Sequence, residues 1–229
     1  MKKNRNISTK LFSQLRANFG DDIQKSFKVK TFQKGDFIYR EGQTPRGVYF
    51  MKYGWVKIFK LDEAYNEVVL HILGNNEFIG YVPLLKKTPY SNNAQALEYC
   101  ELYFIPKEGF LSLLHESNEF AQLIIQMLCD EIWKDEDQIL NLHSKKIDKR
   151  LSTLLLGLEQ ASENDKSYAD SHIRLPKKDL AKIINISAET LSRYLTRFQD
   201  SGLIESVDGI IKVLKKDELH EMSNLKEKE

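Results

Sequence analysis

Hydrophobic and polar positions alternate in short runs between about residues 28 and 108, which is the pattern of β-strands with one buried face. Glycines at positions 35, 42, 54, 74 and 80 interrupt these runs, and glycine favours the turns between strands. The expected strands include residues 47–51, 55–60 and 68–73. Short strands separated by turns in this way predict an antiparallel barrel or roll.

The pattern becomes helical at Ser117 and remains helical to about Leu142. Apolar residues then recur at spacings of three and four and form a stripe wide enough to bury: Phe120, Leu123, Ile124, Met127, Leu128, Ile132, Ile139 and Leu142. Heptad-like spacing in one long helix favours a coiled-coil dimer. The residues expected in the dimer contact are Leu123, Ile124, Met127, Ile132 and Ile139. The alternative is that this helix packs on the sheet of its own chain.

A further helix is expected from Ile147, and a pair of shorter helices from Leu175 to Ser201. The inward positions of the pair, at helical spacing, are Leu180, Ile183, Ile184, Leu191, Leu195 and Phe198. Asn185 lies where the turn between them needs a residue that tolerates a positive φ. Ser187 is a favourable N-cap for the second helix, and Gly202 is a favourable terminator.

Two short β runs, 203–207 and 210–213, follow the second helix, and Asp208-Gly209 between them favours a tight hairpin. Helix, turn, helix and hairpin is the order of a winged helix-turn-helix, whose second helix enters the major groove of DNA. Residues 172–216 hold nine Lys or Arg against five Asp or Glu, whereas the whole chain has a net charge of only +1. Local positive charge favours phosphate contact. The alternative is a ligand-binding or protein-interaction module whose winged helix does not bind DNA.

The beginning of the second helix presents side chains that suit DNA. Glu189, Ser192 and Arg193 fall on one face at spacings i, i+3 and i+4. Arginine can donate two hydrogen bonds to guanine, glutamate can accept from cytosine, and serine can do either. We therefore expect these three residues to contact bases. The residues expected to contact phosphates, and so to position the helix, are Lys177, Lys178, Ser187, Thr190 and Arg197.

Composition excludes several classes of protein. No apolar run approaches the roughly 20 residues that span a bilayer, and the basic first residues lead into no apolar core. We expect a cytoplasmic protein with no membrane partner. Cys100 and Cys129 are too few for a disulfide framework or a metal cluster, and we expect two reduced, buried thiols. No Ser-His-Asp order, zinc spacing or phosphate-binding glycine loop is found, so an enzyme is not expected.

The β-roll, the long helix and the winged helix, in this order, resemble the Crp–Fnr family of bacterial transcription regulators. The matching segments are F-Q-K-G-D-F-I-Y-R-E-G at 32–42, G-W-V-K at 54–57, F-I-G at 78–80, and Ser187 to Arg193 with Leu195, Arg197, Phe198 and Gly202. The resemblance covers roughly residues 28–215. It implies an α+β fold with an N-terminal antiparallel β-roll of the cupin-like jelly-roll type (1–116), a long dimerisation helix (117–145) and a C-terminal winged helix-turn-helix (146–229).

The resemblance implies that a homodimer binds a two-fold symmetric promoter site on double-stranded DNA and contacts RNA polymerase. The family's glutamate and arginine of the recognition helix correspond to Glu189 and Arg193. Ser192 follows the Fnr-type pattern E-T-x-S-R, which implies a half-site of the TTGAT kind. Ala188 departs from the Crp-type arginine at its position, which makes a Crp-like consensus less favourable.

The residues of the family's known sensors are missing. The cyclic-nucleotide pocket uses a glutamate after F-I-G and an Arg-Ser pair about ten residues later, whereas this chain has Tyr81 and Ser91-Asn92 there. The long helix has Lys134-Asp135-Glu136 in place of Thr-Ser. The Fnr-type iron–sulfur cluster needs four thiolates, and a haem would have His71 as its roll-strand ligand, although a lone strand histidine is more often structural. We expect no cyclic AMP binding and no cofactor.

The roll leaves two alternatives open for an effector. A pocket there would be lined by Gly80, Tyr81, Val82, Leu84, Tyr90, Ser91 and Asn92, with Trp133 of the long helix as its wall. Walls of this kind are more apolar than a nucleotide site and suit a small organic ligand. Alternatively, the same side chains fill the roll as its core, and no small-molecule effector exists.

Overall fold

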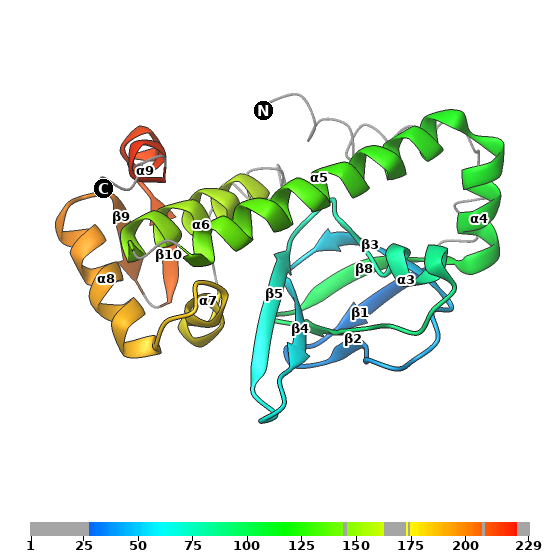
Figure 1. Cartoon of the computed structure of the whole chain (residues 1–229), viewed down its shortest axis with the longest axis horizontal. Coiled ribbons are helices and arrows are strands. Elements are labelled where there is room, and N and C mark those ends of the chain that lie inside the picture. Colours follow the sequence, from blue (N-terminus) through cyan, green and yellow to red (C-terminus); the bar gives the residue numbers. More distant parts are fainter. Residues whose placement is uncertain (1–27, 144–145, 163–172, 174, 208, 224–229) are drawn as a thin grey trace. The chain divides into compact units, whose positions relative to one another are not determined.

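The fold is given by a computed structural model that describes residues 28–143, 146–162, 173, 175–207 and 209–223 (Figure 1). The chain forms two compact units. The first contains the described residues up to Lys60 together with Ile72–Trp133, and the second contains Leu61–His71 and the described residues from Lys134 onward. Within this described part of the chain, no helix combines the length and the apolar character needed to cross a membrane.

Two four-stranded sheets build the roll. The order in one sheet is β1 (Lys28–Phe32), β8 (Cys100–Pro106), β3 (Gly47–Tyr53) and β6 (Phe78–Ile79). The order in the other is β2 (Phe37–Tyr39), β7 (Asn93–Ala96), β4 (Val56–Leu61) and β5 (Glu67–Leu73). The pairs β1–β8, β3–β8, β3–β6, β2–β7 and β4–β7 are antiparallel. The predicted antiparallel roll is therefore confirmed, and β3, β4 and β5 correspond to the three strands expected from the pattern.

Three helices cover the first sheet: α3 (Tyr81–Lys86), α4 (Lys107–Glu116) and the beginning of α5 (Asn118–His143). Their shared core with the sheet consists of Val48, Phe50, Phe78, Tyr81, Leu84, Ile105, Phe110, Leu113, Phe120, Leu123 and Ile124. Ser117 starts α5, because its hydroxyl oxygen accepts a hydrogen bond from the Phe120 N–H at 3.1 Å. The first turns of α5 are thus fixed both by this cap and by burial against the roll.

The second unit contains the predicted winged helix-turn-helix. Its elements are α6 (Ile147–Ser162), α7 (Lys177–Ile183), α8 (Ala188–Asp200), β9 (Ile204–Val207), β10 (Ile210–Val213) and α9 (Lys216–Ser223). The β9–β10 hairpin pairs Val207 with Ile210, although Asp208 of its turn lies outside the described residues. Ile173 forms an antiparallel bridge with Ile211, which the sequence pattern did not predict. The loop expected at 162–171 also lies outside the described residues beyond Ser162.

Candidate nucleic-acid interface

The turn between α7 and α8 is closed by backbone hydrogen bonds. The N–H of Asn185 donates to the Lys182 carbonyl at 3.2 Å, and the N–H of Ile186 donates to the Ala181 carbonyl at 3.0 Å. Asn185 has a φ of 51°, a left-handed conformation that asparagine adopts more readily than most residues. The positive φ expected at this position is therefore confirmed, and it sets the direction in which α8 leaves the turn.

The orientation of α8 about its own axis follows from its cap and its buried face. Ser187 has extended backbone angles, and its hydroxyl oxygen accepts from the Thr190 N–H at 3.1 Å. Leu191, Leu195 and Phe198 are buried, as the helical spacing predicted. The opposite face of α8 is consequently turned to solvent. The helix ends at Asp200 with Ser201 as its C-cap, and Gly202 follows with a φ of 67°.

The three predicted base-contacting residues lie together on that outer face. Glu189 and Arg193 are exposed, and Ser192 between them is half-buried. The pKa of the Glu189 carboxyl is lowered, because the carboxylate is hydrogen-bonded first by its own backbone N–H and then by the Ser187 side chain. Glu189 is therefore an ionised acceptor at neutral pH, beside the donors of Arg193. An acceptor and a forked donor on one face are groups that distinguish base pairs in the major groove.

The predicted phosphate contacts differ in their surroundings. Lys177 and Lys178 are exposed in the first turn of α7. The Ser187 hydroxyl already caps α8, since its oxygen accepts from the Thr190 N–H, and it also lies 3.1 Å from Thr190 Oγ1. The Arg197 guanidinium forms an ion pair with Asp148 of α6 and lies over the Tyr194 ring, 4.4 Å from its centroid. Sequence analysis did not identify Asp148, because nothing in the local pattern relates residues 49 positions apart.

The residues of the predicted effector pocket are mostly packed into the roll. Tyr90 is buried and stacks on Tyr39, with ring centroids 3.7 Å apart and planes within 5°. The Tyr39 hydroxyl donates to Asn92 Oδ1 at 3.0 Å. Gly80 has a φ of 82°, and a Cβ there would lie 3.1 Å from a Tyr90 ring carbon. Ser91 is exposed. The rings of two tyrosines thus occupy the side of the roll on which Gly80 and Asn92 lie.

Tyr81 connects the roll to the long helix. It is buried, and its hydroxyl donates to Glu131 Oε2 of α5 at 2.6 Å. Burial raises the pKa of the Tyr81 phenol, and the Glu131 carboxylate raises it further, so the phenol keeps its proton and remains a donor. Leu84 belongs to the core and Val82 packs against it. Trp133, the expected wall, is 69% exposed.

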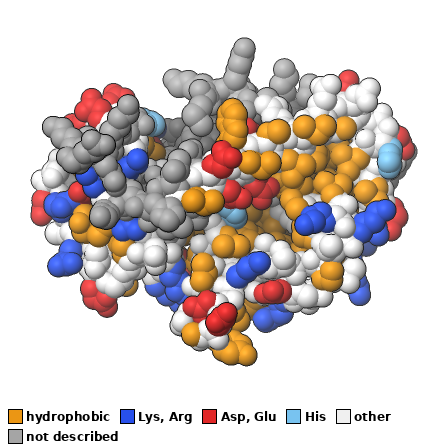
Figure 2. All heavy atoms as spheres, in the orientation of Figure 1, with side chains coloured by type: hydrophobic (Ala, Val, Ile, Leu, Met, Phe, Trp, Pro, Cys, Tyr) orange, Lys and Arg blue, Asp and Glu red, His pale blue; other side chains and the backbone are white. Residues whose placement is uncertain are grey.

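The predicted dimer helix presents two different apolar surfaces. Leu123 and Ile124 are buried against the roll of their own chain, and Met127 packs against the same core. By contrast, Ile132 and Ile139 are exposed. Ile125, which sequence analysis did not select, is exposed by 60%. Figure 2 shows hydrophobic side chains gathered over α5 and beside it on the face in view.

The two cysteines have different environments. Cys100 is buried, and its thiol lies 3.3 Å from the Trp55 carbonyl oxygen. Burial raises the pKa of the Cys100 thiol to about 11. Cys129 of α5 is exposed, so the prediction of two buried thiols is wrong for this residue. The spacing of α5 places Cys129 four residues after Ile125, on the side of the helix that the roll does not cover.

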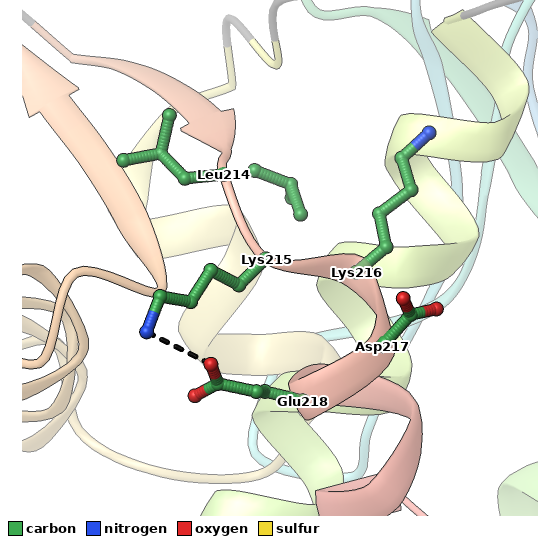
Figure 3. Close-up of a pocket in the computed structure, with 6 residues that line it drawn as sticks. Leu214, Lys215, Lys216, Asp217 and Glu218 are labelled. Carbon is green, nitrogen blue, oxygen red and sulfur yellow. Dashed lines mark ion pairs between the residues drawn. The ribbon is translucent and has the colours of Figure 1, made fainter.

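An open hollow in the second unit lies apart from the predicted residues. Figure 3 shows its lining, which is the single segment Val213–Glu218, from the last residue of β10 into the first turn of α9. Lys215 Nζ pairs with Glu218 Oε1 at 2.8 Å, and Lys216 Nζ pairs with Glu159 Oε1 at 3.2 Å. These charges pair with one another or with the neighbouring helix, so the segment serves to hold α9 against α6.

Comparison with known proteins relates both units to described families. Residues 29–117 match the cyclic nucleotide-binding domain, and residues 149–222 match the Crp-like helix-turn-helix domain. Transcriptional activator protein anr of Pseudomonas aeruginosa is 27% identical over 201 residues, which cover 87% of this chain and 81% of that protein. Electron transport regulator A of Shewanella oneidensis is 29% identical over 189 residues, which cover 81% and 73%.

The fold comparison agrees. The structure of FixK2 from Bradyrhizobium japonicum matches with a TM-score of 0.76 at 19% identity, and covers 87% of this chain and 98% of that one. At this identity the likeness concerns the fold. Both domains match successive parts of the chain, relatives align along most of it, and the fold is shared. This chain therefore belongs to the Crp–Fnr family.

Proposed function

We propose that this protein is a transcription regulator that binds a two-fold symmetric DNA site as a homodimer, with α8 in the major groove. The observation on which the proposal rests is the outer face of α8, where Glu189, Ser192 and Arg193 lie together while the opposite face is buried. The Crp-like helix-turn-helix match and the name of the activator relative support it. The cytoplasm, where the DNA is, is the compartment that this function requires.

The base contacts are assigned by chemistry. Arg193 would donate to guanine, Glu189 would accept from cytosine, and Ser192 would contact either. Lys177, Lys178 and Thr190 would bind phosphates and so position the helix. Ser187 and Arg197 are less favourable phosphate ligands, because the first caps α8 and the second pairs with Asp148. Each would have to exchange a present partner for the phosphate.

The dimer would form through one row of α5. Ile125, Ile132 and Ile139 follow one another at intervals of seven residues, and all three are more than half exposed. Isoleucine at one position of successive heptads is typical of a two-stranded coiled coil. Leu123, Ile124 and Met127 pack on the roll of their own chain instead. A symmetric dimer would present two recognition helices to successive major grooves, about 34 Å apart.

We propose further that DNA binding needs no cyclic nucleotide. The stacked rings of Tyr39 and Tyr90 lie against Gly80, and the Tyr81 hydroxyl already bonds α5 through Glu131. A nucleotide phosphate needs a cation or several N–H donors, and tyrosines offer neither. Contact with RNA polymerase is part of the proposal, and only family membership supports it.

The experiment that tests the function is selection of duplexes from a random pool with the purified full chain, without ligand and at near-physiological salt. We expect enrichment of a palindrome with half-sites of the TTGAT kind. A parallel selection with cyclic AMP should give the same site with the same affinity. If no duplex is enriched in either arm, nor after addition of cell extract, the proposed function is wrong. If enrichment requires cyclic AMP, only the ligand-free part is wrong.

A further inference from the structure

The outer face of α8 continues beyond the three residues assigned to bases. Thr196 follows Glu189 by seven residues, Ser192 by four and Arg193 by three, so it lies on the same face one turn further along the helix. Its side chain is exposed. Sequence analysis gave Thr196 no role, because threonine is common on solvated helix surfaces.

The hydroxyl of Thr196 is used within the helix. Its Oγ1 donates to the carbonyl oxygen of Ser192 at 3.1 Å. A threonine hydroxyl has one proton to donate, and DNA phosphate oxygens only accept hydrogen bonds. In this geometry Thr196 therefore has no donor for a phosphate. The group that it can present to another molecule by an apolar contact is its methyl.

We propose that Thr196 is a further base-reading residue, and that its methyl group contacts the C5-methyl of a thymine in the major groove. Thymine is the base that displays a methyl group there, and a threonine methyl is one of the apolar groups that recognise it. The inference rests on the proposed function, because it needs α8 to lie in the major groove. It adds a thymine to the bases that Glu189, Ser192 and Arg193 specify.

Replacement of thymine by deoxyuracil tests this directly, since it removes only the C5-methyl. Each thymine of the selected half-site is replaced in turn in a duplex with one such change, and affinities are measured for the wild type, Thr196→Ser and Thr196→Val. Thr196→Ser removes the methyl and keeps the hydroxyl, whereas Thr196→Val keeps a methyl and removes the hydroxyl. Circular dichroism verifies that the variants are folded, as expected for an exposed position.

At one thymine position the wild type should lose roughly fourfold in affinity with uracil, as expected for one buried methyl. Thr196→Val should show the same loss there, and Thr196→Ser should bind both duplexes alike. The proposal is overturned if, at every thymine position, uracil causes the same loss of affinity in Thr196→Ser as in the wild type. It is also overturned if Thr196→Val weakens the binding of all sequences by the same factor. Failure of the proposed function differs from both outcomes, because the wild type would then bind none of the duplexes.

Discussion

Arg193 and Arg197 lie one turn apart on α8, but their surroundings give them different roles. Arg193 is exposed on the outer face. The Arg197 guanidinium pairs with Asp148 of α6 and lies over the Tyr194 ring. An arginine specifies guanine when its fork can donate two bonds to one base edge. Arg193 therefore suits base recognition, whereas Arg197 joins α8 to α6 through its ion pair with Asp148.

Replacement of Arg193 by alanine should cost about 1–3 kcal/mol on the selected site and relax specificity at one base pair. Lys178→Ala is the matched control, since it also removes one exposed positive charge of the motif. It should weaken all sequences alike and reduce the salt slope by about one. Fluorescence anisotropy over a panel of single-base variants at several salt concentrations measures both effects. Normal binding of Arg193→Ala to every duplex would exclude its base-reading role.

Local residue patterns were sufficient for some of these assignments. The positive φ of Asn185, the cap at Ser187 and the outer position of Arg193 depend on neighbours within four residues, and all agree with the structure. The Asp148–Arg197 pair and the Tyr81–Glu131 hydrogen bond join residues far apart in the chain. Many acidic residues could meet each partner, and only the tertiary fold selects one.

At the scale of elements, the cap of α8 stabilises the first turn of the helix, which carries the proposed base contacts, in the chain without DNA. Ser187→Ala removes the acceptor of the Thr190 N–H, which should cost about 1 kcal/mol locally. Amide hydrogen exchange at Thr190 should then be roughly fivefold faster. Ser187→Asp keeps a capping acceptor, so exchange should stay near that of the wild type. Unchanged exchange in Ser187→Ala would show that the cap does not stabilise this turn.

The same two variants separate stability from binding. The added negative charge of Ser187→Asp favours the helix N-terminus but repels DNA phosphates. Its affinity for every duplex should fall although α8 is intact. Equal affinities of Ser187→Asp and the wild type would place Ser187 away from the DNA backbone.

The long helix α5 shows the limit of prediction from hydrophobic periodicity. The pattern combined residues of both its faces in one apolar stripe, since both are hydrophobic. In the structure Leu123 and Ile124 are buried against the roll, whereas Ile132 and Ile139 are exposed. Periodicity identifies the helix and its apolar character, but only the position of the sheet decides which face is already covered.

At the scale of the whole molecule, several groups that stay protonated in the folded first unit should make its stability decrease at alkaline pH. Burial raises the pKa of Cys100 from 9.0 to about 11 and also raises the pKa of Tyr39, Tyr81 and Tyr90 above 10.0. The folded chain thus keeps protons that the unfolded chain releases. The contribution of Cys100 is complete below about pH 9 and is lost as the pH rises to about 11.

The free energy of unfolding should therefore decrease between pH 9 and pH 11, which urea denaturation at fixed pH values would measure. Cys100→Ala removes one of the groups whose pKa is raised, so the free energy of unfolding of the variant should decrease less over this range. The cavity left by the substitution lowers the stability of the variant at every pH. The comparison concerns the slope with pH and not the absolute stability. An equal slope in both proteins would contradict the contribution of Cys100.

The proposed dimer would couple α5 to DNA binding, because two recognition helices bind one palindrome more tightly than one helix does. Ile132→Glu places a charge within the exposed isoleucine row of α5, where two such charges would meet across a symmetric seam. We expect the variant to sediment as a monomer. Its affinity for the complete palindrome should fall by roughly 100-fold or more, since the second half-site no longer benefits from high effective concentration.

Leu214→Glu is the matched control, because Leu214 is 51% exposed and Ile132 is 57% exposed, and the same charge is added on a different element. It should remain dimeric. A monomeric Ile132→Glu that still bound the palindrome normally would show that DNA itself assembles two chains without α5. A dimeric Ile132→Glu would instead show that the seam lies elsewhere, and the row Ile125, Ile132 and Ile139 would then need another partner. Sedimentation with and without the palindromic duplex distinguishes these cases, because the mass of the complex gives the number of chains bound.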